Sequence, residues 1–319
     1  MGAAKPLAAA LHQTQHRLHE LYAERAEDWR RDHLGASVVG HECLRYLWLT
    51  FRWAMPGNLE GDGRMQRLLE RGKREEAWIV ADLKAIGIEV WNVDEETGEQ
   101  FRISWGHVGG GVDGVVKGLL EAPKTPHVLE VKTSNAKRFA YLKSKGVERA
   151  NKRHWIQMQV YMLGLGLERA FYVVVCKDND ELYTERVYLD RDAAQAAVDR
   201  AQDVVAMDAP PPAKAPAFPP CMLTSKDGTQ WPCDYFELCH GARLPEKNCR
   251  TCVSSTPRPD GTWHCEHQDE ELTPDDQRDH FDCHMTMPQM VCPGAVQVLE
   301  LDEEKRVITF ARHNGEVIE

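Results

Sequence analysis

The sequence predicts a mixed α/β fold, with helices on both faces of a mixed central sheet and a small cysteine-rich module at the C-terminal end. Two observations indicate this fold class. Helix-like and strand-like patterns of apolar residues alternate from residue 63 to residue 207, which suits a sheet covered by helices. Eight of the ten cysteines lie beyond residue 220, after a stiff Pro/Ala-rich stretch at 209–220. We therefore expect one large domain over residues 1–240 and a cysteine-rich module over 241–319.

Each element follows from its local pattern. Apolar residues at helical spacing predict helices over 1–33, 63–86, 152–164 and 190–207, and segment 37–53 leads into a helix that carries Cys43. Apolar alternation and turn-forming residues at the ends predict strands at 89–93, 101–105, 111–118, 127–132, 170–176 and 182–188. Beyond the cysteines, residues 296–300 and 306–311 alternate as a closing hairpin.

Asp113, Glu130 and Lys132 form the most informative motif of the chain. Asp113 lies in the glycine-rich turn Gly-Gly-Gly-Val-Asp-Gly, and Glu130 and Lys132 alternate with apolar residues on the strand that follows. Alternation points Glu130 and Lys132 to the same face of the sheet. Two carboxylates can hold a hard divalent cation through oxygen, and a lysine can orient or deprotonate a water and screen charge on a phosphate. These three side chains predict hydrolysis of a phosphodiester.

The order of these residues resembles the PD-(D/E)XK nuclease superfamily. Gln157 and Tyr161 stand four apart on the helix after the Glu-x-Lys strand and share one of its faces, which resembles the RecB-like branch of that superfamily. The resemblance implies a restriction-endonuclease-like core with Asp113 and Glu130 holding Mg²⁺ or Mn²⁺. It implies that Gln157 and Tyr161 brace the site and the substrate strand.

The same resemblance implies further site residues and a role. Glu76, on the helix before Asp113, would be an additional ligand, with Glu75 as the alternative, and the Val131 carbonyl would be a further one. The activity implied is that of a DNA exonuclease, acting at DNA ends in phage-type recombination or replication beside a strand-annealing or recombinase protein. Two alternatives are a nuclease that trims DNA ends, as in CRISPR adaptation, and a non-catalytic DNA-binding or partner-binding protein.

The net charge of −11 does not exclude DNA, because the metal site is itself acidic and bound cations reverse its local sign. A basic run between the Glu-x-Lys strand and the Gln-Tyr helix is expected to contact the phosphate backbone, unless it is only a solvated helix face. It contains a single acid, Glu148, and consists of Lys137, Arg138, Lys143, Lys145, Arg149, Lys152 and Arg153.

The cysteines indicate metal sites rather than disulfides, because the N-terminus lacks a secretory segment. Cys233 and Cys239 resemble the C-terminal cysteine pair of iron–sulfur RecB-type nucleases, where one early and three late cysteines hold a [4Fe–4S] cluster. Cys43 stands where the early cysteine is expected. Cys221 is twelve residues ahead of Cys233 instead of the usual three, so it joins the set only if the chain between them folds back. Isolated thiols or a zinc site are the alternatives.

A second cysteine set has the spacing of a zinc ribbon. Cys249 and Cys252 form a Cys-x₂-Cys pair, and Cys265 follows after twelve intervening residues, across a predicted hairpin turn. Cys283 is the expected fourth ligand of a structural Zn²⁺, in competition with His267, His284 and Cys292.

The composition is ordinary for a globular protein, with 42% apolar residues. No apolar run reaches the roughly eighteen residues that a membrane span needs. We therefore expect a cytoplasmic protein.

Overall fold

A computed structural model describes residues 4–26, 28, 30–57, 63–94, 96–217, 219–224, 228–241, 243–279, 282–292, 295–312 and 314–319, with side chains from residue 13 onward apart from Val296. The chain forms two compact units that interleave along the sequence. Unit 1 consists of residues 1–30, 56–101 and 111–189, and unit 2 consists of residues 31–55, 102–110 and 190–319. The sequence predicted one boundary at residue 240, between a nuclease domain and a cysteine-rich module. The two compact units describe how the chain packs, so this division into functional modules stays a prediction.

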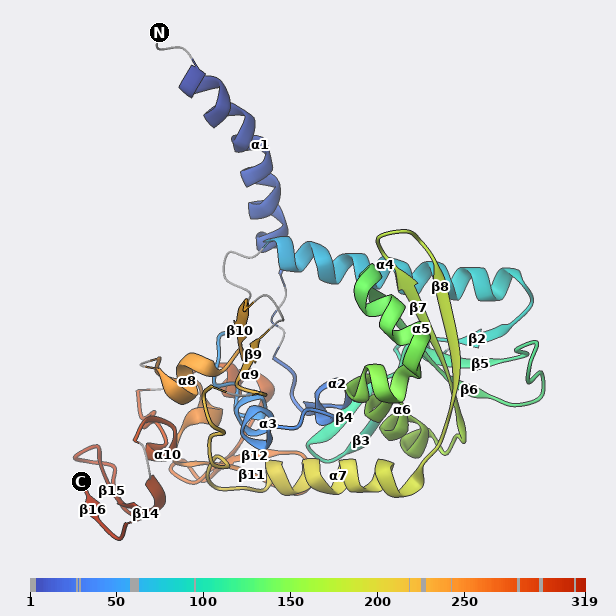
Figure 1. Cartoon of the computed structure of the whole chain (residues 1–319). Helices are drawn as coiled ribbons and strands as arrows, with labels where there is room; N and C mark the ends of the chain where they lie inside the picture. The colour runs from blue at the N-terminus through green and yellow to red at the C-terminus, as the bar shows by residue number, and fades with distance from the viewer. Residues whose placement is uncertain are drawn as a thin grey trace. The chain divides into compact units, whose positions relative to one another are not determined.

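Unit 1 is built on a five-stranded mixed sheet of order β2-β5-β6-β7-β8 (Figure 1). Strands β6 and β7 pair in parallel, and the other neighbouring pairs are antiparallel. The strands are β2 (Glu89–Trp91), β5 (Gly114–Lys117), β6 (His127–Ser134), β7 (Arg169–Cys176) and β8 (Leu182–Tyr188). The helices are α1 (Ala4–Glu24), α4 (Gly63–Ala85), α5 (Ala136–Ala150) and α6 (Lys152–Leu165). This mixed sheet with flanking helices confirms the predicted fold class for this part of the chain.

Helix α4 covers one face of the sheet. Its buried residues Ile79, Val80 and Leu83 join one apolar cluster with strand residues that include Leu129 and Val131 of β6. Because side chains alternate along a strand, Glu130 and Lys132 belong to the opposite face. That opposite face meets α6.

Helices α5 and α6 form the crossover between the parallel strands β6 and β7. Asn135 caps α5 by accepting a hydrogen bond from the Arg138 N–H at 2.9 Å, and Asn151 caps α6 by accepting one from the His154 N–H at 3.3 Å. Helix α5 kinks at Gly146, whose φ of 71° suits glycine. Most of the basic run therefore lies on an α-helix that the sequence did not separate from its surroundings.

Unit 2 contains several short sheets with short helices. Its sheets have the orders β1-β4-β3, β10-β9, β11-β12-β13 and β14-β15-β16. The strands are β1 (Leu34–Gly35), β3 (Arg102–Trp105), β4 (Val108–Gly111), β9 (Met222–Thr224), β10 (Gln230–Pro232), β11 (Ser255–Pro257), β12 (Trp263–Cys265), β13 (Glu270–Leu272), β14 (Ala295–Asp302), β15 (Val307–Arg312) and β16 (Val317–Ile318). The helices are α2 (Ala36–Val39), α3 (Leu44–Phe51), α7 (Arg191–Val205), α8 (Phe236–His240), η1 (Cys249–Thr251), α9 (Pro274–Arg278) and α10 (Pro288–Val291).

The core of unit 2 includes two buried arginines, Arg52 and Arg250, among aromatic rings. Arg250 is 0% exposed, and its guanidinium lies 3.6 Å from the centre of the Trp53 ring and 4.8 Å from that of Trp263. It also donates hydrogen bonds to the Phe51 carbonyl and to Gln277 Oε1. These contacts fix η1, which begins at Cys249 and ends one residue before Cys252, against the aromatic core.

Several predicted elements differ in their bounds from the observed ones. The predicted helix 1–33 ends at Glu24, the last residue of α1. The expected strand 111–118 is two strands, because the chain bends at Asp113 between β4 and β5. Cys43 is the residue before α3 rather than part of a helix. The predicted closing hairpin is confirmed as β14 and β15, and β16 adds a third strand to it.

Among the described residues, no helix is long and apolar enough to cross a membrane.

Candidate active site

Asp113 is held beside the middle of β6 by a backbone hydrogen bond. The N–H of Val131 donates to Asp113 Oδ2 at 2.8 Å. Gly114 follows with a φ of 155°, and a Cβ there would come within 2.9 Å of the Trp91 carbonyl oxygen. Glycine is therefore required directly after Asp113, where β5 approaches β2.

Glu130 is 0% exposed and forms an ion pair with Lys132. Apart from Lys132, no described residue donates a hydrogen bond to either of its carboxylate oxygens. Burial raises the pKa of Glu130 to about 8, with further contributions from the carboxylates of Asp113 and Glu76, while Lys132 opposes the shift. A buried carboxylate without hydrogen bonds is costly unless a cation accompanies it.

Lys132 remains cationic in this setting. Desolvation lowers its pKa, but the carboxylates of Glu130 and Asp113 outweigh that effect and raise the pKa above its ordinary value. The Lys132 ammonium is therefore available as a hydrogen-bond donor and a positive charge at the site.

The structure distinguishes Glu76 from Glu75. Burial and the Asp113 carboxylate raise the pKa of Glu76 to about 7, and Lys132 lowers it, so Glu76 interacts with both of these site residues. Glu75 instead forms an ion pair with Arg71 at 3.5 Å on its own helix. The carboxylate that α4 adds to the site is that of Glu76.

Gln157 and Tyr161 are buried on α6 and are joined to each other. Gln157 Nε2 donates to the Tyr161 hydroxyl at 3.1 Å. Burial raises the pKa of Tyr161, and the nearby Glu130 carboxylate adds to this shift, while Lys132 opposes it. The Gln-Tyr pair thus lies next to the ion pair of Glu130 and Lys132.

His154 and Tyr172 complete the surroundings of Lys132, and the sequence analysis missed both. Tyr172 is paired in register with Glu130, and its hydroxyl lies 2.6 Å from His154 Nδ1. Burial and the Lys132 cation lower the pKa of His154 to about 3, so this ring is neutral. The spacing of His154, three residues before Gln157 on one helix face, was the signal available in the sequence.

The basic run presents exposed side chains near the site. Arg138, in the first turn of α5, and Arg153, in the first turn of α6, are exposed, and their charges contribute to lowering the pKa of His154. Lys143 and Lys152 are neutralised by Glu181 and Glu148, at 2.8 and 3.6 Å. The other exposed members of the run are Lys137, Lys145 and Arg149.

The first cysteine set lies together in unit 2. Cys43, Cys221, Cys233 and Cys239 line one small cavity, along with His240, whose Nε2 lies 3.5 Å from Cys221 Sγ. Strands β9 and β10 form the hairpin that folds the chain back, and the Cys233 N–H donates to the Cys221 carbonyl at 2.8 Å. The displaced Cys221 therefore reaches the position that the sequence left in doubt.

The second cysteine set also lies together in unit 2. Burial raises the pKa of Cys249 to about 12, and the neighbouring Cys252, Cys265 and Cys283 add to the shift. Cys176 is separate from both sets and is buried in β7 as part of the core.

Across the described residues, no three His, Cys, Asp or Glu side chains are arranged around one point as in a metal-binding group.

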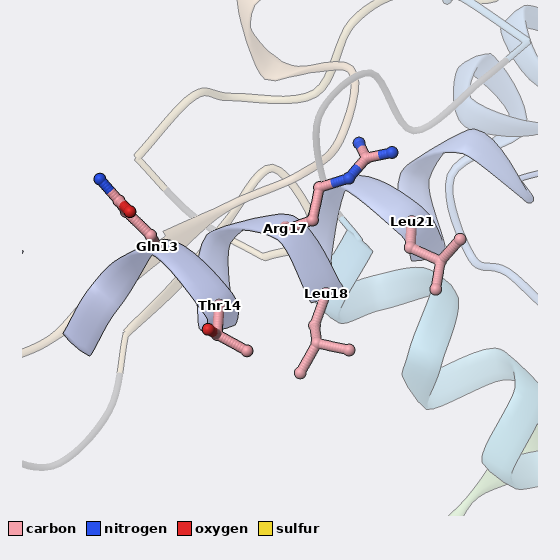
Figure 2. A pocket seen from close by; sticks show the side chains of 5 residues that line it. All are labelled: Gln13, Thr14, Arg17, Leu18 and Leu21. Atoms are coloured by element: carbon pink, nitrogen blue, oxygen red, sulfur yellow. The ribbon is translucent and has the colours of Figure 1, made fainter. Parts of the chain in front are cut away.

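A pocket elsewhere, on α1, is lined among the described residues by Gln13, Thr14, Arg17, Leu18 and Leu21 (Figure 2). These lining residues include no carboxylate and no histidine, so they offer no site for a hard cation.

No protein-family model matches the sequence, and no curated protein matches it either. Among solved structures, the chain is similar to an alkaline exonuclease (LHK-Exo) from Laribacter hongkongensis, with 17% identity over 59% of this chain and 91% of that one and a TM-score of 0.37. It is similar to the protein SSO0001, with 16% identity over 60% and 85% of the two chains and a TM-score of 0.37. A phage-related exonuclease from Haemophilus somnus 129PT is similar at 15% identity over 42% and 68%, with a TM-score of 0.32. TM-scores this low carry no assignment, so function must be argued from the side chains of the site.

Proposed function

We propose that this protein is a metal-dependent DNA nuclease that acts as an exonuclease. The observation that carries the proposal is the convergence of Asp113, Glu130 and Lys132. One carboxylate is fixed to the backbone beside Val131, and the other is fully buried with Lys132 as its one partner among the described residues. The lysine lies next to both.

The carboxylates fit a hard divalent cation. Mg²⁺ or Mn²⁺ would be held by Asp113 and Glu130, with Glu76 and the Val131 carbonyl as further ligands. A bound cation would compensate the buried charge of Glu130, which Lys132 alone offsets among the described residues. When bound, it would supply Lewis-acid stabilisation of phosphate charge and lower the pKa of a bound water.

The remaining side chains orient the reactants. Lys132 donates hydrogen bonds from its ammonium to the attacking water or to a phosphate oxygen, and it screens the negative charge that develops there. The Gln157–Tyr161 pair fixes the α6 side of the site, and the Tyr161 ring braces the substrate strand. In this proposal these side chains orient the reactants and transfer no proton.

The exposed arginines support DNA as the substrate. Arg138 and Arg153 lie in the first turns of the crossover helices α5 and α6, where they would contact phosphates next to the scissile bond. Lys137, Lys145 and Arg149 would extend this contact along α5. Action at DNA ends, and a role in phage-type recombination beside an annealing protein, rest on the family resemblance of the motif.

Degradation of end-labelled linear duplex DNA tests the proposal. Wild-type protein with Mg²⁺ should release label from linear DNA and leave closed-circular DNA intact, and chelation should stop the reaction. Lys132→Ala should abolish release, whereas Lys124→Ala, at an exposed lysine between β5 and β6, should not. Cleavage of the closed circle would contradict the exonuclease assignment. DNA binding without any cleavage would replace the nuclease by a binding protein.

We also propose that Cys43, Cys221, Cys233 and Cys239 hold a [4Fe–4S] cluster. Their position around one cavity and the β9–β10 hairpin support this ligand set. Protein purified without oxygen should contain iron and acid-labile sulfide, and Cys233→Ser should remove both. Cys292→Ser is the matched control, because Cys292 does not line this cavity. Colourless wild-type protein that carries zinc at these cysteines would contradict the cluster.

A further inference from the structure

The segment from Cys249 to Thr286 carries four cysteines on stretches of backbone that are hydrogen-bonded to one another in unit 2. We propose that Cys249, Cys252, Cys265 and Cys283 bind one structural Zn²⁺ as a tetrahedral four-thiolate site. The proposal concerns stability and ligand identity, and it does not depend on the nuclease activity.

Cys249 and Cys252 form a single tight knuckle. They flank Arg250 and Thr251, and the Cys252 N–H donates to the Cys249 carbonyl at 3.1 Å. Arg250 is fully buried against Trp53, so the position of the knuckle is fixed by the core rather than by the thiols. A Cys-x₂-Cys knuckle of this kind supplies two adjacent corners of a zinc tetrahedron.

The hairpin of β11 and β12 brings Cys265 to the knuckle. Ser255 is paired with Cys265 in the antiparallel register, and the Ser255 N–H donates to the Cys252 carbonyl at 3.3 Å. The Glu266 N–H donates to the Ser254 carbonyl at 2.8 Å. Cys265 is therefore tied by backbone hydrogen bonds to residues two and three beyond Cys252.

The segment that carries Cys283 is bonded to the same knuckle. Cys252 forms an antiparallel bridge with Thr286, and the Val253 N–H donates to the Met285 carbonyl at 2.8 Å. Earlier in this segment, the Asp279 carbonyl accepts from the Cys249 N–H at 3.0 Å. Cys283 lies between these two attachment points, so the knuckle has one cysteine-bearing segment on each side.

The other candidates for the fourth ligand are less well placed. His267 Nδ1 pairs with the Glu303 carboxylate, and His284 Nε2 lies 3.2 Å from Thr251 Oγ1. Cys292 follows α10, beyond the bridge between Cys252 and Thr286 that attaches this segment to the knuckle. Cys283 lies in a turn between the two points of attachment, so the backbone bonds carry its choice as the fourth ligand.

The proposed zinc explains how such short elements hold together. Strands β11, β12 and β13 have three residues each, and α9 has five. Elements of this length bury little apolar surface on their own, and a metal that crosslinks three segments replaces part of a core. Loss of the zinc is therefore expected to unfold this part of unit 2 first.

Metal analysis of the full chain tests the site. Wild-type protein should contain about one zinc per chain. Cys283→Ser should lose zinc and lower the Tm, while its iron content should stay at the wild-type value. Cys292→Ser and His284→Ala should keep the zinc. Absence of zinc from wild-type protein, or loss of zinc in Cys292→Ser or His284→Ala but not in Cys283→Ser, would overturn the ligand set.

Cobalt substitution keeps the test decisive if Cys283→Ser does not fold. Wild-type protein loaded with Co²⁺ should show the absorption of a tetrahedral site with four thiolates. A spectrum of three thiolates and one imidazole would overturn Cys283 as the fourth ligand. Neither measurement uses DNA, so failure of the nuclease proposal would leave both results unchanged.

Discussion

The carboxylate of Asp113 accepts a hydrogen bond from the backbone N–H of Val131 at 2.8 Å. Val131 lies between Glu130 and Lys132, so this one bond sets the position of Asp113 against both charged neighbours. The geometry of the site thus depends on the pairing of β5 with β6, which begins at Gly114 and Leu129.

Asp113→Asn should remove the negative charge of this residue and keep its hydrogen bond to Val131. The amide oxygen of asparagine can still accept from Val131, so the free energy of unfolding should change by less than about 1 kcal/mol. Activity should fall by about 100-fold or more, because a neutral amide is a poor ligand for a hard cation. Asp113→Ala should lose both properties. Thermal unfolding and DNA degradation measured on both variants check this, and an active Asp113→Asn enzyme would contradict the role of the carboxylate.

Glu76 and Glu75 form a matched pair of substitutions. Glu76→Gln should reduce the rate of DNA degradation by about 10-fold or more, because Glu76 interacts with Asp113 and Lys132. Glu75→Gln should leave the rate within about twofold, because Glu75 pairs with Arg71 outside that cluster. Initial rates at saturating Mg²⁺ provide the measurement. Equal losses of rate in both variants would show that the substitutions disturb helix α4 and do not remove a carboxylate that acts at the site.

Glu130→Gln should have opposite effects on stability with and without metal. In chelator, burial penalises the Glu130 carboxyl, as its raised pKa of about 8 shows, and a neutral glutamine avoids that penalty. Because Lys132 keeps the Asp113 carboxylate beside it, the free energy of unfolding should rise by about 1 kcal/mol. With Mg²⁺, the wild-type protein should gain stability by binding and the variant should not. Tm values recorded in chelator and over a Mg²⁺ series check both parts. A variant that is still stabilised by Mg²⁺ to the wild-type extent would remove Glu130 from the metal site.

The exposed arginines should control the affinity for DNA. A double substitution of Arg138 and Arg153 by glutamine should weaken DNA binding by about 10-fold at moderate salt and reduce the salt dependence by about two phosphate contacts. Lys143→Gln is the control, because Lys143 already pairs with Glu181. Binding to duplex DNA at several salt concentrations, in chelator to prevent cleavage, measures the difference. If the dependence of DNA affinity on salt concentration is unchanged in the double variant, the basic run is a solvated helix face that does not contact phosphates.

His107 should make unit 2 sensitive to acid. Burial and the nearby Arg250 cation lower the pKa of His107 to about 4, against an ordinary value of 6.5. The unfolded chain therefore binds more protons than the folded chain between these values, so stability is complete above pH 6.5 and is lost as the pH falls toward 4. The contribution is at most about 3 kcal/mol. His107→Gln should flatten the dependence of unfolding free energy on pH in this range, measured at equal metal content. An unchanged slope would assign the acid sensitivity to other groups.

Much of the fold was accessible from the sequence wherever a pattern repeats over many residues. Helices α4 and α6 and strands β7 and β8 lie within two residues of their predicted bounds, because each is long enough for its apolar pattern and its flanking turn residues to be read in the sequence. The short elements of the cysteine-rich segment were not predicted in the same way. Three residues give no period, and contacts with the buried Arg250 and with neighbouring strands hold these elements in place.

The sequence by itself determined the chemistry that the chain can offer. Asp113 in a glycine turn, Glu130 and Lys132 alternating on one strand, and the cysteine spacings are local facts, set by neighbours within a few residues. Only the tertiary structure decided which residues meet. It brought Glu76 rather than Glu75 into electrostatic interaction with Asp113, paired Tyr172 in register with Glu130, and folded Cys221 back to Cys233. These contacts depend on strand register and helix packing between segments far apart in the chain.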